Sequence, residues 1–255
     1  MATRRAGTTG RAGSARPGAA LDRGALDRGA LAPQLRAGLD ALGLDRTLAE
    51  PLLDYLALLV KWNAVYNLTA VRDPRQMLAQ HLLDSLAVVP LLAERLPRRS
   101  GLPSGLVIDV GSGAGLPGIV LAQAWPRAEV LLVEPIGKKA AFLRQCQSEL
   151  ALTNIQVAEA RVESLEPARF KDPDLIICRA FASLADYVAA IDRLVAPATT
   201  VAAMKGVWPA DEIAALPPGW TLCQSLRVEV PALDAERHLL LLQRSSQQRA
   251  HTSHR

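Results

Sequence analysis

Residues 107–118 read VIDVGSGAGLPG and carry the strongest signal for the class of fold. This stretch joins a short apolar run to a loop with glycine at positions 111, 113, 115 and 118, and a helix-like segment follows at about 116–125. Glycine permits tight turns and lets backbone N–H groups come close to a ligand. A glycine-rich loop between a strand and a helix therefore predicts a nucleotide-binding site at the end of the first strand.

An acidic residue follows the loop at the spacing that such a site needs. Glu134 ends the next apolar run, about 20 residues further on, where a carboxylate can accept hydrogen bonds from both hydroxyls of a ribose. Two classes of cofactor suit this arrangement. A nicotinamide dinucleotide suits it because Gly113, Gly115 and Gly118 satisfy the G-x-G-x-x-G pattern. S-adenosylmethionine suits it because Asp109 and the first glycines would line its amino-acid end.

Three features favour S-adenosylmethionine. Asp109 lies two residues before the first glycine, which suits a cofactor that carries an ammonium group. About 100 residues precede the loop, whereas dinucleotide-binding domains often begin with it. Residues 220–230 and 238–243 are strand-like with no helix between them, which predicts a terminal antiparallel hairpin unlike a doubly wound dinucleotide domain. A nicotinamide-dependent oxidoreductase stays as the alternative.

The apolar pattern predicts an α/β fold. Short apolar runs alternate with helix-like segments, which is typical of a mostly parallel twisted sheet with helices on both faces. Residues 33–97 instead repeat apolar residues at helical spacing and predict an N-terminal helical cap. We expect a disordered extension at 1–31, the cap at 32–98, a Rossmann-like domain at 99–243 and a disordered basic tail at 244–255.

The positive charge lies at the two ends of the chain. The 255 residues carry a net charge of +4, but residues 1–20 contribute +4 and residues 244–255 contribute +3, which leaves −3 for residues 32–243. Bulk charge is therefore weak evidence for nucleic-acid binding. The 3 cysteines form no C-x-x-C pair, and no apolar run is long enough to span a membrane. We expect a cytoplasmic protein without a metal site or a disulfide scaffold.

Five segments of the sequence resemble one bacterial family. They are WNAVYNLT at 62–69, HLLDSL at 81–86, DVGSGAGLPG at 109–118, KKAAFL at 138–143 and RAFASL at 179–184. In this order they are similar to the family called glucose-inhibited division protein B, or RsmG. The resemblance covers about residues 35–243 and implies a class I S-adenosylmethionine-dependent methyltransferase fold. It also implies methylation of N7 of one guanine, at position 527 in the decoding-region loop of 16S rRNA.

The resemblance implies a set of cofactor contacts. The first glycine of the loop is Gly111, and Leu116 precedes the loop proline. After the third strand, a backbone N–H and an acidic side chain at Val162 and Glu163 would hold the adenine. Arg179, at the end of the fourth strand, is the last contact. The expected cofactor-binding residues are thus Gly111, Gly113, Leu116, Glu134, Val162, Glu163 and Arg179. Glu134 departs mildly from the family pattern, in which aspartate can stand at this position. Glutamate keeps the negative charge but has a longer side chain.

The residues after the fourth strand bear on the chemistry. Residues 178–181 read CRAF, whereas enzymes that methylate exocyclic amines often carry an Asn/Asp-Pro-Pro-aromatic motif there. Guanine N7 attacks with its own lone pair and loses no proton, so alignment matters more than a general base. We therefore predict no catalytic side chain. The intact loop and Glu134 favour an enzyme over a non-catalytic RNA-binding factor of ribosome assembly, which is the third possibility.

The substrate side is less well defined by the sequence. Lys205, at the end of the fifth strand, is predicted to contact RNA or to be a surface lysine. His81 is predicted to contact a base or to be packed within its helix. Trp62 and Tyr66 either stack on an RNA base or join the cap to the domain. The expected partner is 16S rRNA, within the 30S subunit or an assembly intermediate, and the expected enzyme is a monomer.

Overall fold

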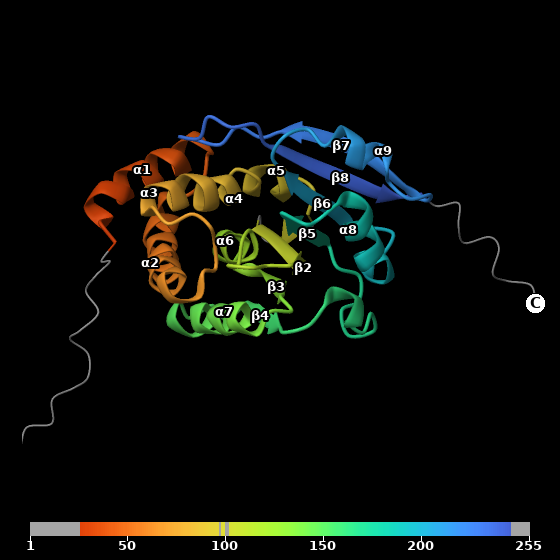
Figure 1. The fold of residues 1–255 in the computed structure, drawn as a ribbon, viewed down its shortest axis with the longest axis horizontal. Helices are drawn as coiled ribbons and strands as arrows, with labels where there is room; N and C mark the ends of the chain where they lie inside the picture. Colours follow the sequence, from red (N-terminus) through yellow and green to blue (C-terminus); the bar gives the residue numbers. More distant parts are fainter. Residues whose placement is uncertain (1–25, 97, 100–101, 246–255) are drawn as a thin grey trace, which may run out of the picture.

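The computed structural model describes residues 26–96, 98–99 and 102–245. Most of the two ends that we expect to be disordered lies outside these residues. A group of helices lies beside a single sheet, with further helices on the faces of the sheet (Figure 1). The α-helices are α1 (Arg28–Ala41), α2 (Ala49–Tyr66), α3 (Pro74–Met77), α4 (Asp84–Leu86), α5 (Val89–Ala93), α6 (Gly118–Ala124), α7 (Gly137–Glu149), α8 (Leu184–Ile191) and α9 (Ala210–Ala214).

In the part of the chain that the structure describes, four further helical segments are not α-helical. The π-helical segment η2 (Leu78–Leu83) lies between α3 and α4, and the 3-10 segments are η1 (Arg46–Leu48), η3 (Val162–Ser164) and η4 (Asp192–Leu194). The strands are β1 (Arg98–Arg99), β2 (Leu102–Val110), β3 (Arg127–Val133), β4 (Ile155–Ala158), β5 (Leu175–Arg179), β6 (Thr200–Lys205), β7 (Trp220–Arg227) and β8 (His238–Arg244).

The sheet has the predicted mixed topology. Its order is β4-β3-β2-β5-β6-β8-β7, with the short β1 paired to β2. The neighbours from β4 to β6 are parallel, whereas β8 is antiparallel to both β6 and β7. The terminal antiparallel hairpin is thereby confirmed. Because β2 and β5 are adjacent and parallel, their carboxyl ends meet, and the glycine loop and the residues after β5 lie at one edge of the sheet.

The core explains why the strands read as continuous apolar runs. Side chains of one face, such as Val107 and Ile177, pack in one cluster with α6, α7 and the cap helices. Side chains of the other face, such as Ile108 and Ile176, pack in a second cluster with α8. A parallel strand buried on both faces needs apolar residues at every position, so its sequence does not alternate.

The ordered cap begins earlier than we predicted. Helix α1 starts at Arg28 because Asp27 caps it, accepting a hydrogen bond from the N–H of Ala30, and Leu31 is buried. The boundary at residue 32 is therefore wrong. At the other end, β8 includes Arg244, whose guanidinium pairs with Asp192 at 3.1 Å, so the boundary at residue 243 is one residue short.

One helical run of the cap is notably apolar. Among the described residues, only Pro74–Ala93 is long and apolar enough to cross a membrane by length and composition. It comprises 20 residues, and 72% of its most apolar window is buried inside the protein. The run is thus a core helix of the cap, and it packs against α1, α2 and α6.

Candidate active site

The glycine loop is fixed to the neighbouring strand. The N–H groups of Gly111 and Ser112 both donate to the carbonyl oxygen of Val133, at 2.9 and 3.1 Å. Gly111 has a φ of +70°, which glycine adopts without the steric cost that a side chain brings. At Gly118 a β-carbon would lie 2.6 Å from Asp109 Oδ2, so only glycine lets the start of α6 come this close to β2.

Asp109 lies behind the loop rather than in the site. Its side chain is fully buried, and Oδ2 accepts a hydrogen bond from the N–H of Gly118 at 3.0 Å. Oδ1 has no hydrogen-bond partner among the described residues. Burial raises the pKa of Asp109 to about 7. The prediction that Asp109 lines the amino-acid end of a cofactor is therefore wrong, because its carboxyl group braces the first turn of α6 instead.

Glu134 holds the glycine loop from the side of β3. Its residue is only 3% exposed, and its two carboxylate oxygens accept N–H bonds from Gly113 (2.8 Å) and Ile136 (2.9 Å). Each carboxylate oxygen can accept a second hydrogen bond, so a ribose hydroxyl still has acceptors here. The structure thus brings Glu134 and Gly113 together as expected, while ribose binding stays a prediction.

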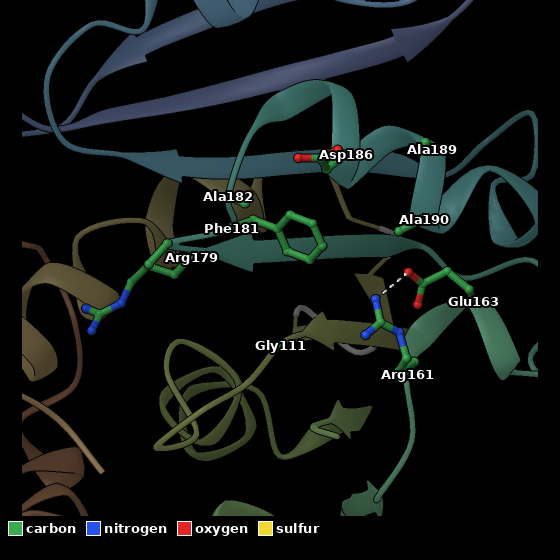
Figure 2. Close-up of a pocket in the computed structure, with 10 residues that line it drawn as sticks. Gly111, Arg161, Glu163, Arg179, Phe181, Ala182, Asp186, Ala189 and Ala190 are labelled. Atoms are coloured by element: carbon green, nitrogen blue, oxygen red, sulfur yellow. Dashed lines mark hydrogen bonds and ion pairs between the residues drawn. The ribbon is translucent and has the colours of Figure 1, made fainter. Parts of the chain in front are cut away.

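A cavity of about 640 Å³ opens at the carboxyl ends of β2 and β5 (Figure 2). Gly111, Glu163 and Arg179, three of the predicted cofactor contacts, line it together. Val162 and Leu116 are buried at 6% and 5% exposure and do not line it. Its volume lies within the usual range for small-molecule sites, about 300–1,000 Å³.

The chain turns sharply where β5 enters the site. Ala180 has a φ of +57°, a left-handed conformation that is unusual for alanine and is common at functional sites. The turn separates two neighbours: Figure 2 shows Phe181 in the cavity and the guanidinium of Arg179 directed away from Glu163. The Phe181 ring packs against Tyr187 of α8, with centroids 5.5 Å apart. Sequence reasoning missed Phe181 as a lining residue, although it lies within the segment RAFASL.

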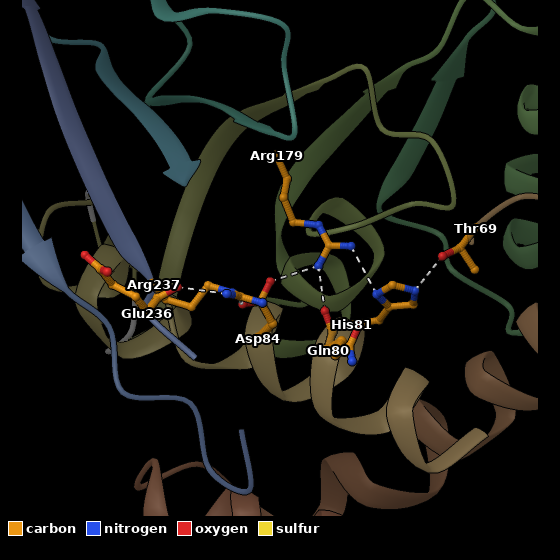
Figure 3. A network of polar contacts seen from close by, with 7 residues as sticks. All are labelled: Thr69, Gln80, His81, Asp84, Arg179, Glu236 and Arg237. Carbon is orange, nitrogen blue, oxygen red and sulfur yellow. Dashed lines mark hydrogen bonds and ion pairs between the residues drawn. The ribbon is translucent and has the colours of Figure 1, made fainter. Parts of the chain in front are cut away.

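The guanidinium of Arg179 is held by the π-helical segment and α4 of the cap (Figure 3). Nη1 donates to the carbonyl oxygen of Gln80 at 3.1 Å and to Asp84 Oδ2 at 2.9 Å, and Nη2 donates to His81 Nδ1 at 3.2 Å. The side chain of Arg179 is 21% exposed. The cap therefore fixes the orientation of a residue that lines the cavity.

His81 is packed within its helix. It is 6% exposed, and its burial and the positive charge of Arg179 lower the pKa of the imidazole to about 4. A neutral ring that accepts from Arg179 at Nδ1 carries its proton on Nε2, which then donates to Thr69 Oγ1 at 2.8 Å. Since both nitrogens are engaged within the protein, the structure favours the packed histidine over the base contact.

Lys205 is paired with Glu212 at the end of β6. Its side chain is 11% exposed, and Nζ contacts the two carboxylate oxygens of Glu212 at 3.0 and 2.7 Å. Glu212 also accepts the N–H of Leu184, the first residue of α8, at 2.7 Å. Lys205 does not line the cavity, and a contact with RNA would require this ion pair to open.

The cap is joined to the glycine loop by aromatic residues of α2. Tyr55 is fully buried and donates its hydroxyl proton to the carbonyl oxygen of Ala114 at 2.6 Å. Trp62 packs against Phe142 of α7 and against Tyr66, with centroid distances of 5.5 and 5.1 Å. The interpretation of Trp62 as a joint between cap and domain is thus confirmed. Tyr55 escaped sequence reasoning because an aromatic residue at helical spacing reads only as core.

Comparisons with known proteins point to one family. The family model described as "GidB: rRNA small subunit methyltransferase G" matches residues 48–240. A Burkholderia vietnamiensis protein named "Ribosomal RNA small subunit methyltransferase G" is 55% identical over 194 residues, which are 74% of this chain and 81% of that protein. A protein of the same name from Xanthomonas oryzae pv. oryzae is 48% identical over 212 residues, covering 83% of this chain and 94% of its own.

A solved structure supports the fold. The structure described as a SAM dependent methyltransferase from Aquifex aeolicus matches with a TM-score of 0.50 at 16% sequence identity. The match covers 67% of this chain and 93% of that one. Together with the strand order, this likeness confirms the class I methyltransferase fold. The helices α1 to α5 form the N-terminal cap.

Proposed function

Because the chain belongs to the family of rRNA small subunit methyltransferase G, we propose that it methylates N7 of one guanine of 16S rRNA, guanine 527 in the decoding-region loop. The family methylates small-subunit rRNA with S-adenosylmethionine as the methyl donor. The observation that carries the proposal is the cavity in which Gly111, Glu163 and Arg179 meet at the carboxyl edge of the sheet.

The residues around the cavity suit S-adenosylmethionine. Gly111 leaves open space, because a β-carbon there would meet no atom within 4 Å. The Glu163 carboxylate and the N–H of Val162 would hold the adenine, and Glu134 has lone pairs left for the ribose. The glycine loop and Arg179 would hold the methionine end. When bound, the cofactor supplies a methyl group on a positively charged sulfur, which makes that methyl group electrophilic.

The polar residues near the cavity suit a nucleophile that needs no base. Guanine N7 would attack with its own lone pair, so no side chain would have to remove a proton from it. Of the carboxylates that line the cavity, Glu163 pairs with Arg161, and Asp186 accepts a hydrogen bond from Ser183. His81 is neutral, and both of its nitrogens are engaged. The work of the protein is therefore alignment and exclusion of water.

Methyl transfer from a labelled cofactor tests the proposal. The purified protein is incubated with methyl-labelled S-adenosylmethionine and either 30S particles or 16S rRNA that lack the modification, and the labelled nucleosides are identified. We expect 7-methylguanosine as the single product. Gly111→Asp places a carboxylate in the cavity and should abolish the transfer while the protein stays folded.

Other outcomes would support the other two classes of function. NADH binding without S-adenosylmethionine binding, measured by calorimetry, would favour an oxidoreductase. RNA binding without label in RNA, across several salt and assembly conditions, would favour a non-catalytic assembly factor. Label on an exocyclic amine would leave a methyltransferase but contradict N7 as the target.

A further inference from the structure

One buried carboxylate serves two arginines beside the cavity. Asp84 is 4% exposed; its Oδ2 pairs with Arg179 Nη1 at 2.9 Å, and its Oδ1 pairs with Arg237 Nε at 2.7 Å (Figure 3). Arg179 comes from β5, Arg237 directly precedes β8, and Asp84 begins α4. Asp84 thus joins the cap, the parallel part of the sheet and the terminal hairpin, although it lies 153 residues from Arg237.

Among the described residues, these two arginines share the single carboxylate of Asp84, which leaves one positive charge unmatched. At the same edge of the sheet, Lys205 pairs with Glu212 and Arg161 pairs with Glu163, one cation to one anion. Glu236 does not supply the missing anion. Its carboxylate oxygen contacts His238 Nε2 at 2.6 Å and the N–H of Trp208 at 3.3 Å, and Figure 3 shows it directed away from Asp84.

Both guanidinium groups also keep free donors. A guanidinium has five N–H bonds, of which Arg179 uses three and Arg237 uses one from Nε and one from Nη1. In the described part of the chain, no acceptor meets Arg179 Nε or Arg237 Nη2. The side chains are 21% and 26% exposed, so a ligand can reach them. Oriented guanidinium donors with an unmatched charge suit a phosphate group.

We propose that Arg237 binds a phosphate of the substrate RNA, oriented by Asp84, which also fixes Arg179 at the edge of the cavity. The inference rests on the proposed function for its ligand, since RNA supplies one negative charge per phosphodiester. It adds Arg237 as an RNA-binding residue and Asp84 as a positioning residue. The site would hold the RNA backbone next to the cavity, which bulk charge does not do because residues 32–243 are net negative.

The variant Arg237→Gln tests the phosphate contact. We expect the KM for 30S particles to rise about tenfold, and the slope of log affinity against log salt to fall by about 0.7–1, as for one lost phosphate contact. The affinity for S-adenosylmethionine, measured by calorimetry, should stay unchanged. The matched control is Arg244→Gln, since Arg244 is also a paired arginine of this hairpin but lies at the other end of β8. The control should leave KM and slope unchanged.

The variant Asp84→Asn separates positioning from charge. It removes a negative charge, so an account based on charge alone predicts tighter RNA binding and retained methyl transfer. The positioning account predicts that kcat/KM falls at least tenfold despite the added charge, and that Asp84→Glu restores part of it. Circular dichroism and thermal unfolding check that the variants fold.

The outcomes are distinguishable. An Arg237→Gln variant with unchanged KM and salt slope would overturn the phosphate site, and a folded Asp84→Asn variant with normal kcat/KM would overturn the positioning role. In both cases the parent protein would still methylate RNA. Absence of methyl transfer by the parent protein would instead contradict the proposed function.

Discussion

An alanine substitution at Gly111 tests cofactor binding, and the same substitution at Gly43 controls for its effect on the backbone. Gly111 (φ +70°) and Gly43 (φ +66°) share a left-handed conformation, and at neither would a β-carbon meet an atom within 4 Å. Gly111 lines the cavity, whereas Gly43 follows α1 in the cap. Changing either to alanine should lower the free energy of unfolding by about 1–2 kcal/mol.

Only Gly111→Ala should weaken S-adenosylmethionine binding, by at least tenfold, because its β-carbon occupies space that the cofactor needs. Calorimetry measures the affinity, and denaturant unfolding measures the stability. Equal cofactor affinity in the two variants would contradict the assignment of the cavity.

The buried imidazole of His81 should make stability depend on pH. Its pKa falls from 6.5 to about 4 on folding, so between these values the unfolded chain binds a proton that the folded chain does not. The free energy of unfolding therefore decreases as the pH falls through this window, by an amount on the order of 3 kcal/mol. His81→Gln should remove this dependence.

Asp109 also makes the stability depend on pH, so the parent protein has to be compared with the His81→Gln variant. Its pKa rises from 3.8 to about 7, so it favours the folded state at acidic pH and its contribution is lost as the pH rises. The difference between the parent and His81→Gln, from denaturant unfolding at several pH values, isolates His81. A difference that does not vary between pH 4 and 6.5 would show that the imidazole is not buried in its neutral form.

Residues that the strand pattern brings to one edge of the sheet could be predicted as a site. A contact between side chains far apart in sequence could not. The structure brings Arg179 to the cavity beside Gly111 and Glu134 to the glycine loop, as their positions at strand ends predict, because parallel strands bring their carboxyl ends together. Asp109 was misplaced because the sequence does not show that its side chain faces α6. Arg237 could not be found, since its role depends on a contact with Asp84 across 153 residues.

At the scale of elements, α2 holds the glycine loop through one hydrogen bond. Tyr55→Phe removes the hydroxyl that donates to Ala114 and leaves a buried carbonyl oxygen without its donor. We expect the free energy of unfolding to fall by about 1–3 kcal/mol and S-adenosylmethionine to bind more weakly, because the loop loses its support from the cap. Thermal unfolding and calorimetry measure the two effects. A loss of stability with unchanged cofactor affinity would show that Tyr55 stabilises the fold but does not support cofactor binding.

The elements themselves were largely predictable. Apolar runs gave β2 to β6 in the correct order along the chain, because buried parallel strands carry apolar residues on both faces. The start of α1 was missed, since residues 21–30 read LDRGALDRGA, a short duplication that is typical of an extension. In the structure, Asp27 caps the helix and Arg28 pairs with Asp54, so a cap and a tertiary contact hold residues that composition predicted to be disordered.

At the scale of the whole molecule, the charge of the chain ends should act separately from the site. Residues 1–25 carry +4 and residues 246–255 carry +2, while residues 26–245 carry −2. A chain limited to residues 26–245 should keep its affinity for S-adenosylmethionine and its melting temperature. It should bind rRNA more weakly at low salt, with little difference at high salt, because charge contacts with phosphate are screened. Identical rRNA binding at all salt concentrations would show that the ends do not contribute.

The position of the methyl group on 16S rRNA is the property by which the proposed activity is best measured. After reaction of unmodified 30S particles with the purified protein, strand scission at 7-methylguanosine followed by primer extension locates each modified nucleotide. We predict one new site, at guanine 527 in the decoding-region loop, that is absent with Gly111→Asp. Scission at another guanine, at several guanines, or at none while the particles take up labelled methyl groups would contradict the proposed activity.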